Sequence, residues 1–119
     1  MNTKALVKSW FGKWEEGDFI NLPISDIFTH TSPFGIIEGK EAYLHVVNEN
    51  RDKFLGYKFE IQDEIYLDNK ACVRYKASQN DFDLEVSEWY YIQDNLIDRI
   101  IAHYHIGEIK NDRKLKNEN

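Results

Sequence analysis

The second half of the chain alternates apolar and polar residues with a period of two, which is the pattern of half-buried β-strands. Phe59, Ile61 and Asp63, for example, share one face and alternate with lysine, glutamate and glutamine residues. Asp-Asn pairs at positions 68–69 and 94–95 are typical of tight hairpin turns, which make consecutive strands antiparallel neighbours. The pattern predicts four antiparallel strands over residues 57–67, 71–77, 84–93 and 96–106.

The start of the chain has the period of an α-helix instead. Between Thr3 and Glu16, apolar side chains recur along one face, with lysines and glutamates opposite. Thr3 can cap the start of this helix, and Gly17 suits the left-handed conformation that follows a helix end. The apolar stripe consists of Leu6, Val7, Trp10, Phe11 and Trp14. We expect it to face the core, where one wall of a core can also be one wall of a pocket.

The region between these two patterns contains mixed signals. It predicts a short helix over residues 18–26, interrupted by Pro23, and a strand over residues 27–32. A glycine-bracketed loop is expected at residues 35–39, followed by an amphipathic helix over residues 40–54. The order helix, helix, strand, helix and then four strands predicts an α+β domain with helices on one face of a curved sheet.

Length and charge limit what the chain can be. Its 119 residues suffice for one domain, which we place at residues 1–109, and the charged segment 110–119 is expected to be a mobile tail. The net charge of −6 repels phosphate backbones, so no nucleic-acid partner is expected. The lone Cys72 cannot form an internal disulfide, and no apolar run resembles a signal peptide or a membrane span. We therefore expect a cytoplasmic protein that contacts no membrane.

Three segments carry a combination of motifs that points to a known family. Residues 32–35, Ser-Pro-Phe-Gly, form a proline-containing bend, and residues 38–43 begin a helix after a glycine. Residues 88–95 and 96–105 follow as a strand rich in aromatic residues, a turn and a last strand with two histidines. In this order and spacing the segments resemble the nuclear transport factor 2-like superfamily, in particular its SnoaL-like and ketosteroid-isomerase-like branch.

The resemblance extends over nearly the whole chain, from Leu6 to Ile106. It implies a cone-shaped, strongly curved antiparallel sheet closed by three N-terminal helices, which is a cystatin-like or nuclear transport factor 2-like roll. It also implies an apolar cavity open at one end and a homodimer formed through the outer face of the sheet. Members of the superfamily include isomerases, cyclases, dehydratases, hydrolases and proteins without chemistry, so the fold leaves the function open.

Candidate acid–base residues come from the alternation and from the resemblance. His30 titrates near neutrality and is the first candidate, although it could instead be satisfied by a neighbouring group or lie at the pocket rim. Glu88 could pair with His30 or His103, either as a catalytic acid–base device or as a structural ion pair. Asp63 is a possible further acid. The other residues expected to contact a ligand are Trp10, Trp14, Phe28, Ser32, Tyr43, Tyr75, Tyr90 and His105.

Ser32 and His105 depart from the patterns of known enzymes in the superfamily. Ser32 stands where steroid isomerases carry a catalytic aspartate, and His105 stands where SnoaL-type cyclases carry a late aspartate, so neither reaction is expected unchanged. His103 and His105, two positions apart on a strand, could hold a metal ion together with His30 or Glu88. Members of the superfamily usually work without metal, so neither a metal nor another cofactor is expected.

These residues predict a protein that holds a small apolar or aromatic molecule in a cone-shaped pocket. Any catalysis would be cofactor-free acid–base chemistry of the isomerase, cyclase or dehydratase type, with Tyr90 donating a hydrogen bond to developing negative charge. The alternative is a non-catalytic ligand-binding or dimeric interaction module. Catalysis requires ionisable groups that converge in the cavity, whereas a binding module would have a mainly aromatic cavity with histidines at its rim or in the interface.

Overall fold

The computed structural model describes residues 2–105, so the predicted tail at residues 110–119 and the predicted domain end at residue 109 lie outside the described residues. The elements in chain order are α1 (Thr3–Glu16), the 3₁₀ turn η1 (Phe19–Asn21), β1 (Ile24–Ser32), β2 (Gly35–Glu38), α2 (Lys40–Glu49), α3 (Arg51–Phe54), β3 (Lys58–Tyr66), β4 (Lys70–Gln79), β5 (Phe82–Gln93) and β6 (Leu96–His103). No helix within the described residues is long and apolar enough to cross a membrane.

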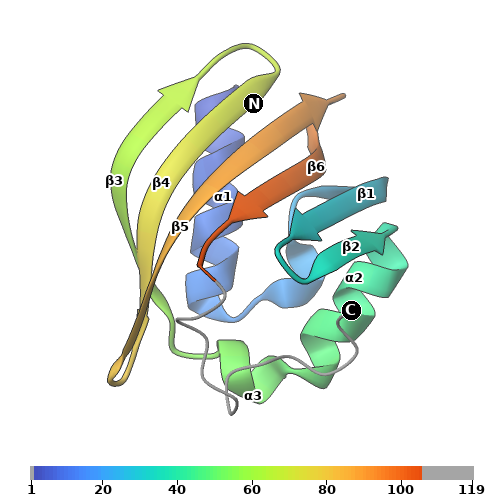
Figure 1. Cartoon of the computed structure of the whole chain (residues 1–119). Helices are drawn as coiled ribbons and strands as arrows, with labels where there is room; N and C mark the ends of the chain where they lie inside the picture. The colour runs from blue at the N-terminus through green and yellow to red at the C-terminus, as the bar shows by residue number, and fades with distance from the viewer. Residues whose placement is uncertain (1, 106–119) are drawn as a thin grey trace.

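Six strands form one curved sheet in the order β2-β1-β6-β5-β4-β3 (Figure 1). The predicted α+β class with a strongly curved sheet is confirmed, and β2 and β3 remain as open edges. The sheet is mixed rather than wholly antiparallel, because β1 runs parallel to β6. Hairpin turns orient only strands that follow one another, so no local pattern could reveal the relative direction of two strands from opposite ends of the chain.

Strand β2 occupies residues for which the sequence predicted a loop. It pairs antiparallel with β1, with Gly35 opposite Ser32. The backbone N–H of Phe34 donates a hydrogen bond of 3.2 Å to Oγ of Ser32, which closes the turn between the two strands. A strand this short, between glycines, has too few residues to display an alternation.

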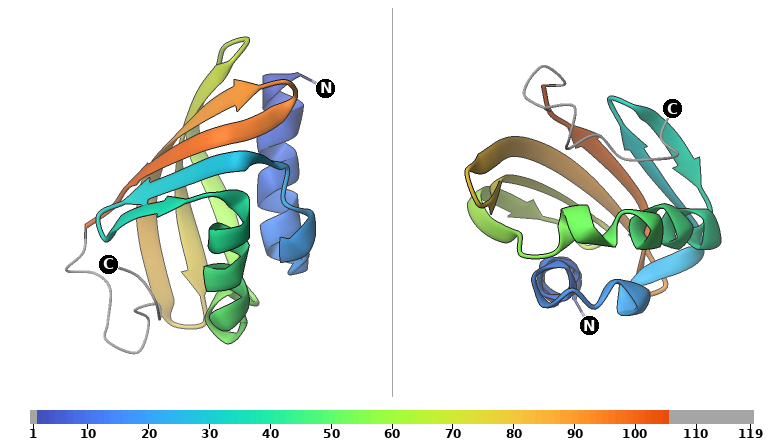
Figure 2. Two further views of the ribbon diagram at one scale, coloured as in Figure 1. Left: turned by 90° about the vertical axis from the view of Figure 1, so that its right-hand side faces the viewer. Right: turned by 90° about the horizontal axis from the view of Figure 1, so that it is seen from below.

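Helix α1 lies against the concave face of the sheet beside β3 and β4, while α2 packs on β1 and β2 (Figure 2). The predicted apolar stripe of α1 is confirmed, since all of its residues are buried. The cap differs from the prediction, because Oδ1 of Asn2 accepts the Ala5 N–H at 2.7 Å. Thr3 instead donates a hydrogen bond of 2.7 Å to the carbonyl of Asp68 and thereby ties α1 to the β3–β4 turn.

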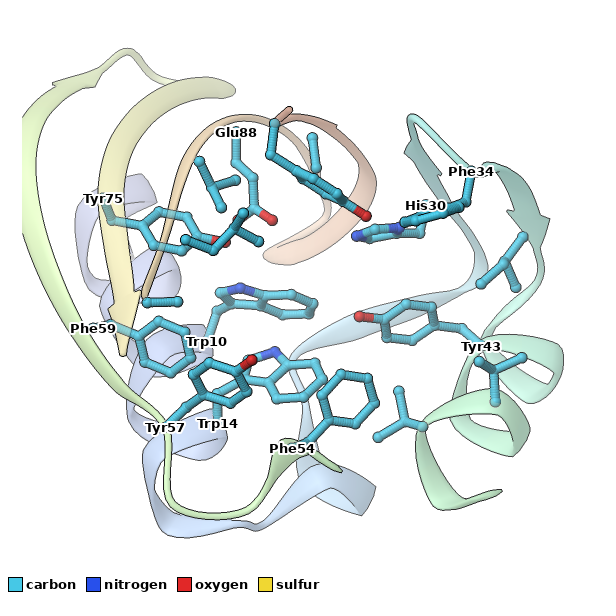
Figure 3. Close-up of a pocket in the computed structure, with 18 of the residues that line it drawn as sticks. Trp10, Trp14, His30, Phe34, Tyr43, Phe54, Tyr57, Phe59, Tyr75 and Glu88 are labelled. Atoms are coloured by element: carbon cyan, nitrogen blue, oxygen red, sulfur yellow. The ribbon is translucent and has the colours of Figure 1, made fainter. Parts of the chain in front are cut away.

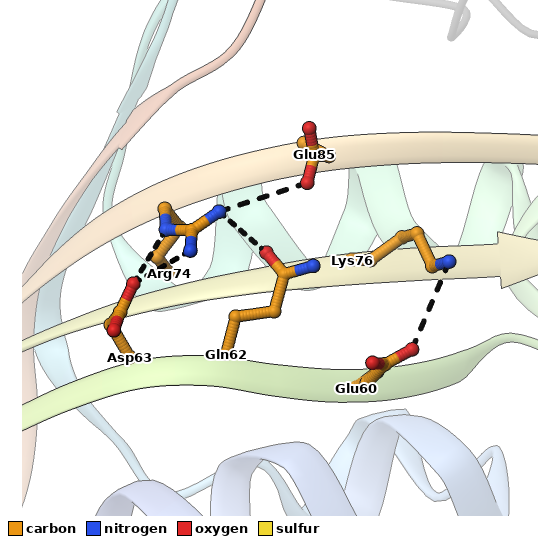
Figure 4. Close-up of polar contacts among 6 residues, drawn as sticks. All are labelled: Glu60, Gln62, Asp63, Arg74, Lys76 and Glu85. Carbon is orange, nitrogen blue, oxygen red and sulfur yellow. Dashed lines mark hydrogen bonds and ion pairs between the residues drawn. The ribbon is translucent and has the colours of Figure 1, made fainter.

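A register shift in β3 reverses the faces of its later side chains. The shift lies between Ile61 and Asp63. Phe59 and Ile61 pack against the core as predicted, but Asp63 points outward and forms an ion pair of 2.7 Å with Arg74 (Figure 4). The prediction of Asp63 as an acid in the pocket is therefore wrong. One extra residue in a strand moves every following side chain to the opposite face, and the sequence pattern does not mark that residue.

The outer face at β3, β4 and β5 is charged. Arg74 also donates to Oε1 of Gln62 at 2.8 Å and lies 3.7 Å from Glu85, while Lys76 lies 3.8 Å from Glu60 (Figure 4). These side chains are substantially exposed, so each pair stabilises the fold only slightly. Their position defines which face of the sheet is in contact with solvent.

Two glycines, one within α1 and one directly after it, should respond oppositely to substitution by alanine. Gly17 ends α1 with φ of +78°, and a Cβ there would lie 2.9 Å from Cδ2 of Leu55. We expect Gly17→Ala to lower the free energy of unfolding by about 1–3 kcal/mol. Gly12, within α1, has no atom within 4 Å of an added Cβ. Gly12→Ala should therefore raise the free energy of unfolding by about 0.5–1 kcal/mol, measured by urea denaturation. Destabilisation by both substitutions would contradict the prediction.

Candidate functional site

A cavity with a volume of about 180 Å³ lies between the concave face of the sheet and the helices α1 and α2 (Figure 3). Most of its wall is aromatic. The lining residues are Trp10, Trp14, His30, Phe34, Ile37, Tyr43, Val46, Val47, Phe54, Tyr57, Phe59, Tyr75, Ala77, Phe82, Leu84, Val86, Glu88, Ala102 and Tyr104. Helices and strands from the whole described chain thus meet around one space.

Several residues that the sequence proposed do line this cavity. Trp10 and Trp14 enter from α1, Tyr43 from α2 and Tyr75 from β4. The Trp10 ring lies 5.7 Å from the Trp14 ring and 6.4 Å from the Tyr43 ring, measured between centroids. Their placement agrees with the sequence analysis, and their contact with a ligand stays a prediction.

Phe28, Tyr90 and Ser32 do not line the cavity. Phe28 and Tyr90 are completely buried, each with 0% of its surface exposed, and form a layer behind the wall. Ser32 lies in a separate surface groove between β2 and α2, where its hydroxyl accepts the hydrogen bond of the β1–β2 turn. The expectation that these three side chains form part of the pocket wall is therefore wrong. Alternation identified the correct face for Phe28 and Tyr90, but it cannot distinguish a filled core from a cavity wall.

The predicted inward placement of His103 and His105 is wrong. His103 is opposite Ser87 on the outer face, and both histidines are exposed. A register shift between β5 and β6 makes Asp98 an extra residue in β6, which reverses the faces that follow it. Tyr104, between the two histidines, lines the cavity instead. Among residues 2–105, no group of three histidine, cysteine, aspartate or glutamate side chains is placed to hold a metal ion.

Other aromatic residues of the wall were not singled out from the sequence. They are Phe34, Phe54, Tyr57, Phe59, Phe82 and Tyr104. A signal existed for part of this set, because Phe82, Leu84, Val86 and Glu88 lie at every second position. The strand was predicted to begin at residue 84, whereas β5 begins at Phe82, after a turn around Asn80, which has φ of +53°.

Glu88 projects from β5 into the cavity, and only 5% of its surface is exposed (Figure 3). The hydroxyl of Tyr90 donates to its Oε1 at 2.5 Å, and the hydroxyl of Tyr75 also hydrogen-bonds to the carboxylate. Burial raises the pKa of Glu88 from 4.5 to about 7, while the two hydroxyl groups oppose this rise. Burial and the Glu88 charge raise the pKa values of Tyr75 and Tyr90, so both remain hydrogen-bond donors.

His30 points into the same cavity from β1 (Figure 3). Its ring centroid lies 5.2 Å from that of Tyr43 and 6.4 Å from that of Phe28. Burial lowers the pKa of His30 from 6.5 to about 4, so the imidazole is neutral at pH 7. A neutral imidazole has one N–H donor and one acceptor nitrogen. The two pKa shifts arise from burial and not from an ion pair between His30 and Glu88.

The cavity therefore combines a carboxyl group that titrates near neutrality with a neutral imidazole. General acid–base catalysis is most efficient when the pKa of the catalytic group lies near the operating pH, and Glu88 meets this condition. Buried groups with strongly shifted pKa values in a cavity are also candidates for functional sites. The arrangement can accept and return one proton and can donate a hydrogen bond to a ligand oxygen.

No protein-family model matches the sequence, and no curated protein matches it. Solved structures do resemble the fold. An NTF2-like protein of unknown function from Cytophaga hutchinsonii has a TM-score of 0.78 and 18% identity, over 90% of this chain and 93% of that chain. An epoxide hydrolase/cyclase-like enzyme with a role in pyran ring formation in salinomycin has a TM-score of 0.72 and 16% identity, over 88% of this chain and 92% of that chain.

A protein assigned as a polyketide cyclase from Xanthomonas campestris is similar as well, with a TM-score of 0.71 and 15% identity over 88% of this chain and 91% of that chain. At these identities the similarity shows the fold alone. The chain has the nuclear transport factor 2-like fold, which it shares with SnoaL-like and ketosteroid-isomerase-like proteins, and the fold hosts more than one activity.

The opposite pKa shifts predict opposite pH effects on stability. The folded state holds the Glu88 proton more tightly than the unfolded chain, so this group destabilises the fold as pH rises from about 4.5 to about 7. The folded state holds the His30 proton less tightly, so this group stabilises the fold as pH rises from about 4 to 6.5. In wild type the two effects largely cancel between these values.

Glu88→Gln should therefore become more stable relative to wild type as pH rises from 4.5 to 7. The difference in the free energy of unfolding should reach about 3 kcal/mol, because one pKa unit corresponds to about 1.4 kcal/mol. His30→Gln should lose stability relative to wild type as pH rises from about 4 to 6.5. Urea denaturation at several pH values measures both differences. Glu85→Gln, on the exposed face of the same strand, is the control and should show no such trend; a similar trend there would refute the assignment to Glu88.

Proposed function

We propose that this chain binds a small, largely apolar molecule in the cavity and acts on it by cofactor-free acid–base chemistry of the isomerase, cyclase or dehydratase type. The observation that carries the proposal is that Glu88 and His30 point into one apolar cavity with pKa values shifted in opposite directions. Two similar structures are described as cyclase-type proteins, which supports chemistry of this class without defining the substrate.

Glu88 is the proposed proton carrier. A carboxyl group with a pKa of about 7 can both remove a proton and return it at neutral pH. His30, with a pKa of about 4, is a weak base at that pH and is better suited to donate its N–H to a substrate oxygen that gains negative charge. Glu88 thereby takes the role of first acid–base candidate, for which the sequence favoured His30. Tyr90 holds the Glu88 carboxylate from behind the wall instead of contacting the substrate.

The size of the cavity limits the ligand. A cavity of about 150 Å³ is enough to hold benzene, and the cavity described here has about 180 Å³. A single ring or a short branched chain fits this space, whereas a four-ring steroid skeleton does not. This agrees with the replacement of the steroid isomerase aspartate by Ser32, whose side chain lies outside the cavity.

The alternative function is non-catalytic binding of a ligand by the same fold. The predominantly aromatic wall favours this alternative, because aromatic side chains supply affinity without chemistry. A small cyclic ketone such as cyclohexenone distinguishes the two functions. Binding alone would perturb its NMR signals, whereas acid–base catalysis would also exchange its α-protons with solvent deuterium.

We expect the wild-type protein to accelerate this exchange in D₂O, measured by ¹H NMR. Glu88→Gln should reduce the enzymatic rate about 10²- to 10⁴-fold, because it removes the proton carrier. His30→Gln should reduce it about 10²-fold or more, because it changes the donor to the developing oxyanion. Glu85→Gln and His45→Gln, on exposed surfaces, serve as controls and should retain activity. Binding of the ketone without exchange would support the non-catalytic function.

We also propose a homodimer formed through the outer face of the sheet. A row of mostly apolar residues crosses this face from edge to edge, in the paired order Ile65, Cys72, Trp89, Ile101, Thr31 and Ile36. Ile65 is 65% exposed, Ile36 53% and Trp89 40%. An exposed apolar row is unfavourable in water, and a second copy of the chain would cover it with the same row.

The free thiol of Cys72 is compatible with a reducing compartment, and we propose that the protein resides in the cytoplasm.

Light scattering after size-exclusion chromatography tests the proposed homodimer. We expect a dimer mass for wild type and a monomer mass for Trp89→Lys, because a lysine ammonium group in the centre of the row cannot be buried without a partner. Ile20→Lys changes a residue of η1 that is 76% exposed, and it should leave the dimer intact. A monomeric wild type would rule the dimer out.

A further inference from the structure

The cavity contains one carboxyl group and, among its described lining residues, no lysine or arginine. The hydroxyls of Tyr75 and Tyr90 hydrogen-bond to Glu88 but do not neutralise its charge. His30 is neutral at pH 7. The ionised Glu88 therefore gives the cavity a negative charge that no side chain of its described wall balances.

The wall around this carboxyl group consists largely of aromatic rings. Trp10 lies between Trp14 and Tyr43 in the cavity wall, with ring centroids 5.7 Å and 6.4 Å away, and Tyr75 lies beside Glu88 (Figure 3). The faces of aromatic rings carry negative partial charge and attract cations, and tryptophan does so most strongly. The ring faces and the carboxylate therefore both favour a positively charged ligand.

We propose that the ligand of this cavity is a small organic cation, namely a quaternary or protonated amine on a short apolar body. The inference rests on the proposed function, since it concerns the same cavity, and it adds the charge class of the ligand. Glu88 serves as the counter-ion, the ring faces of Trp10 and its neighbours contact the ammonium group, and the apolar body contacts the remaining wall. The volume of about 180 Å³ admits a trimethylammonium group with a short chain.

The charge of the cavity also disfavours the binding of anions and of neutral molecules. An anion would meet the carboxylate of Glu88 and the net charge of −6 of the whole chain, a charge that attracts cations toward the protein. A neutral molecule of the same shape supplies no counter-charge, so it would bind with Glu88 in its protonated form. Among these three classes of ligand, only an ammonium group both pairs with the ionised form of Glu88 and binds to the ring faces.

Cation binding has a characteristic pH dependence. A cation pairs with ionised Glu88, so its affinity should rise as pH passes the Glu88 pKa of about 7, whereas a neutral hydrogen-bond acceptor would bind better to the protonated form. His30 is neutral on both sides of this pH, since its pKa is about 4. Tyr75 on β4 and Tyr90 on β5 contact Glu88 directly. The other titratable groups of the described cavity wall are His30 on β1, Tyr43 on α2, Tyr57 before β3 and Tyr104 after β6.

Choline and its neutral isostere 3,3-dimethylbutan-1-ol are the probes, and isothermal titration calorimetry on the full chain measures their affinities. At pH 8 we expect choline to bind at least tenfold more tightly than the alcohol. The cation–π and ion-pair contributions together exceed about 1.4 kcal/mol, which corresponds to a factor of ten in affinity. Choline affinity should rise about tenfold from pH 6 to pH 8, following the ionised fraction of a group with a pKa of about 7. Affinity for the alcohol should not rise.

Glu88→Gln should weaken choline binding at least tenfold and abolish its pH dependence, while it leaves the affinity for the alcohol within about threefold. Glu85→Gln, at an exposed position of the same strand, should bind choline like wild type. Should Glu88→Gln fail to fold, the pH dependence of wild type remains as the test. Equal affinities for the two probes, or choline affinity that falls as pH rises, would overturn the inference.

The two proposals fail in different ways. Binding of the alcohol without choline overturns the cation inference and leaves the apolar cavity of the proposed function in place. Binding of choline without any deuterium exchange, on ketone or amine-bearing substrates, supports the cation inference and overturns the catalytic part of the proposed function. Binding of neither probe overturns the cation inference, while the proposed function is still decided by the exchange measurement with cyclohexenone.

Discussion

The packing of α1 into the curved sheet is the contact on which the rest of the structure depends. The sheet is open at β2 and β3, so it cannot enclose a volume by itself. Phe11 packs 5.0 Å from Tyr75, 5.5 Å from Phe59 and 6.3 Å from Tyr90, measured between ring centroids. These contacts hold α1 across the concave face. Trp10, next to Phe11, and Trp14, about one turn further along, form part of the cavity wall, so the same helix completes the core and the candidate site.

The chemistry proposed for the cavity depends on Glu88, a carboxyl group whose burial in an apolar core is unfavourable. Glu88 lies among buried aromatic and aliphatic residues, and ionising it there opposes folding. Tyr75 and Tyr90 compensate part of this unfavourable term through their hydrogen bonds. A buried carboxyl group with a shifted pKa, in one cavity with a neutral imidazole, is a candidate for a functional site. Both proposals for this protein therefore depend on the same residue.

Strand β5 links the two faces of the sheet. Glu88 and Tyr90 point inward, while Trp89 between them belongs to the apolar row on the outer face. Because side chains alternate along a strand, the residues that form the cavity and those proposed to form the dimer contact are sequence neighbours. Any change in register on this strand would disturb both surfaces at once.

Part of the site could be predicted from the sequence. Local periodicity identified α1 and the inward face of β5, because each depends only on the spacing along one element. Six of the proposed site residues line the cavity, namely Trp10, Trp14, His30, Tyr43, Tyr75 and Glu88. The placement of Asp63, His103 and His105 was wrong, because a single extra residue in β3 or β6 reverses the faces that follow. Pairing between strands decides where such a residue lies, and a pattern read along one strand does not contain that information.

The sequence by itself determined the fold class, the aromatic composition of the interior and the presence of a glutamate and a histidine at inward positions. Only the tertiary structure decided that Glu88 and His30 share one cavity and that β1 runs parallel to β6. It also decided which of the two groups titrates near neutrality. Desolvation raises the pKa of an acid and lowers that of a base, and its extent depends on how elements distant in the sequence pack around each group.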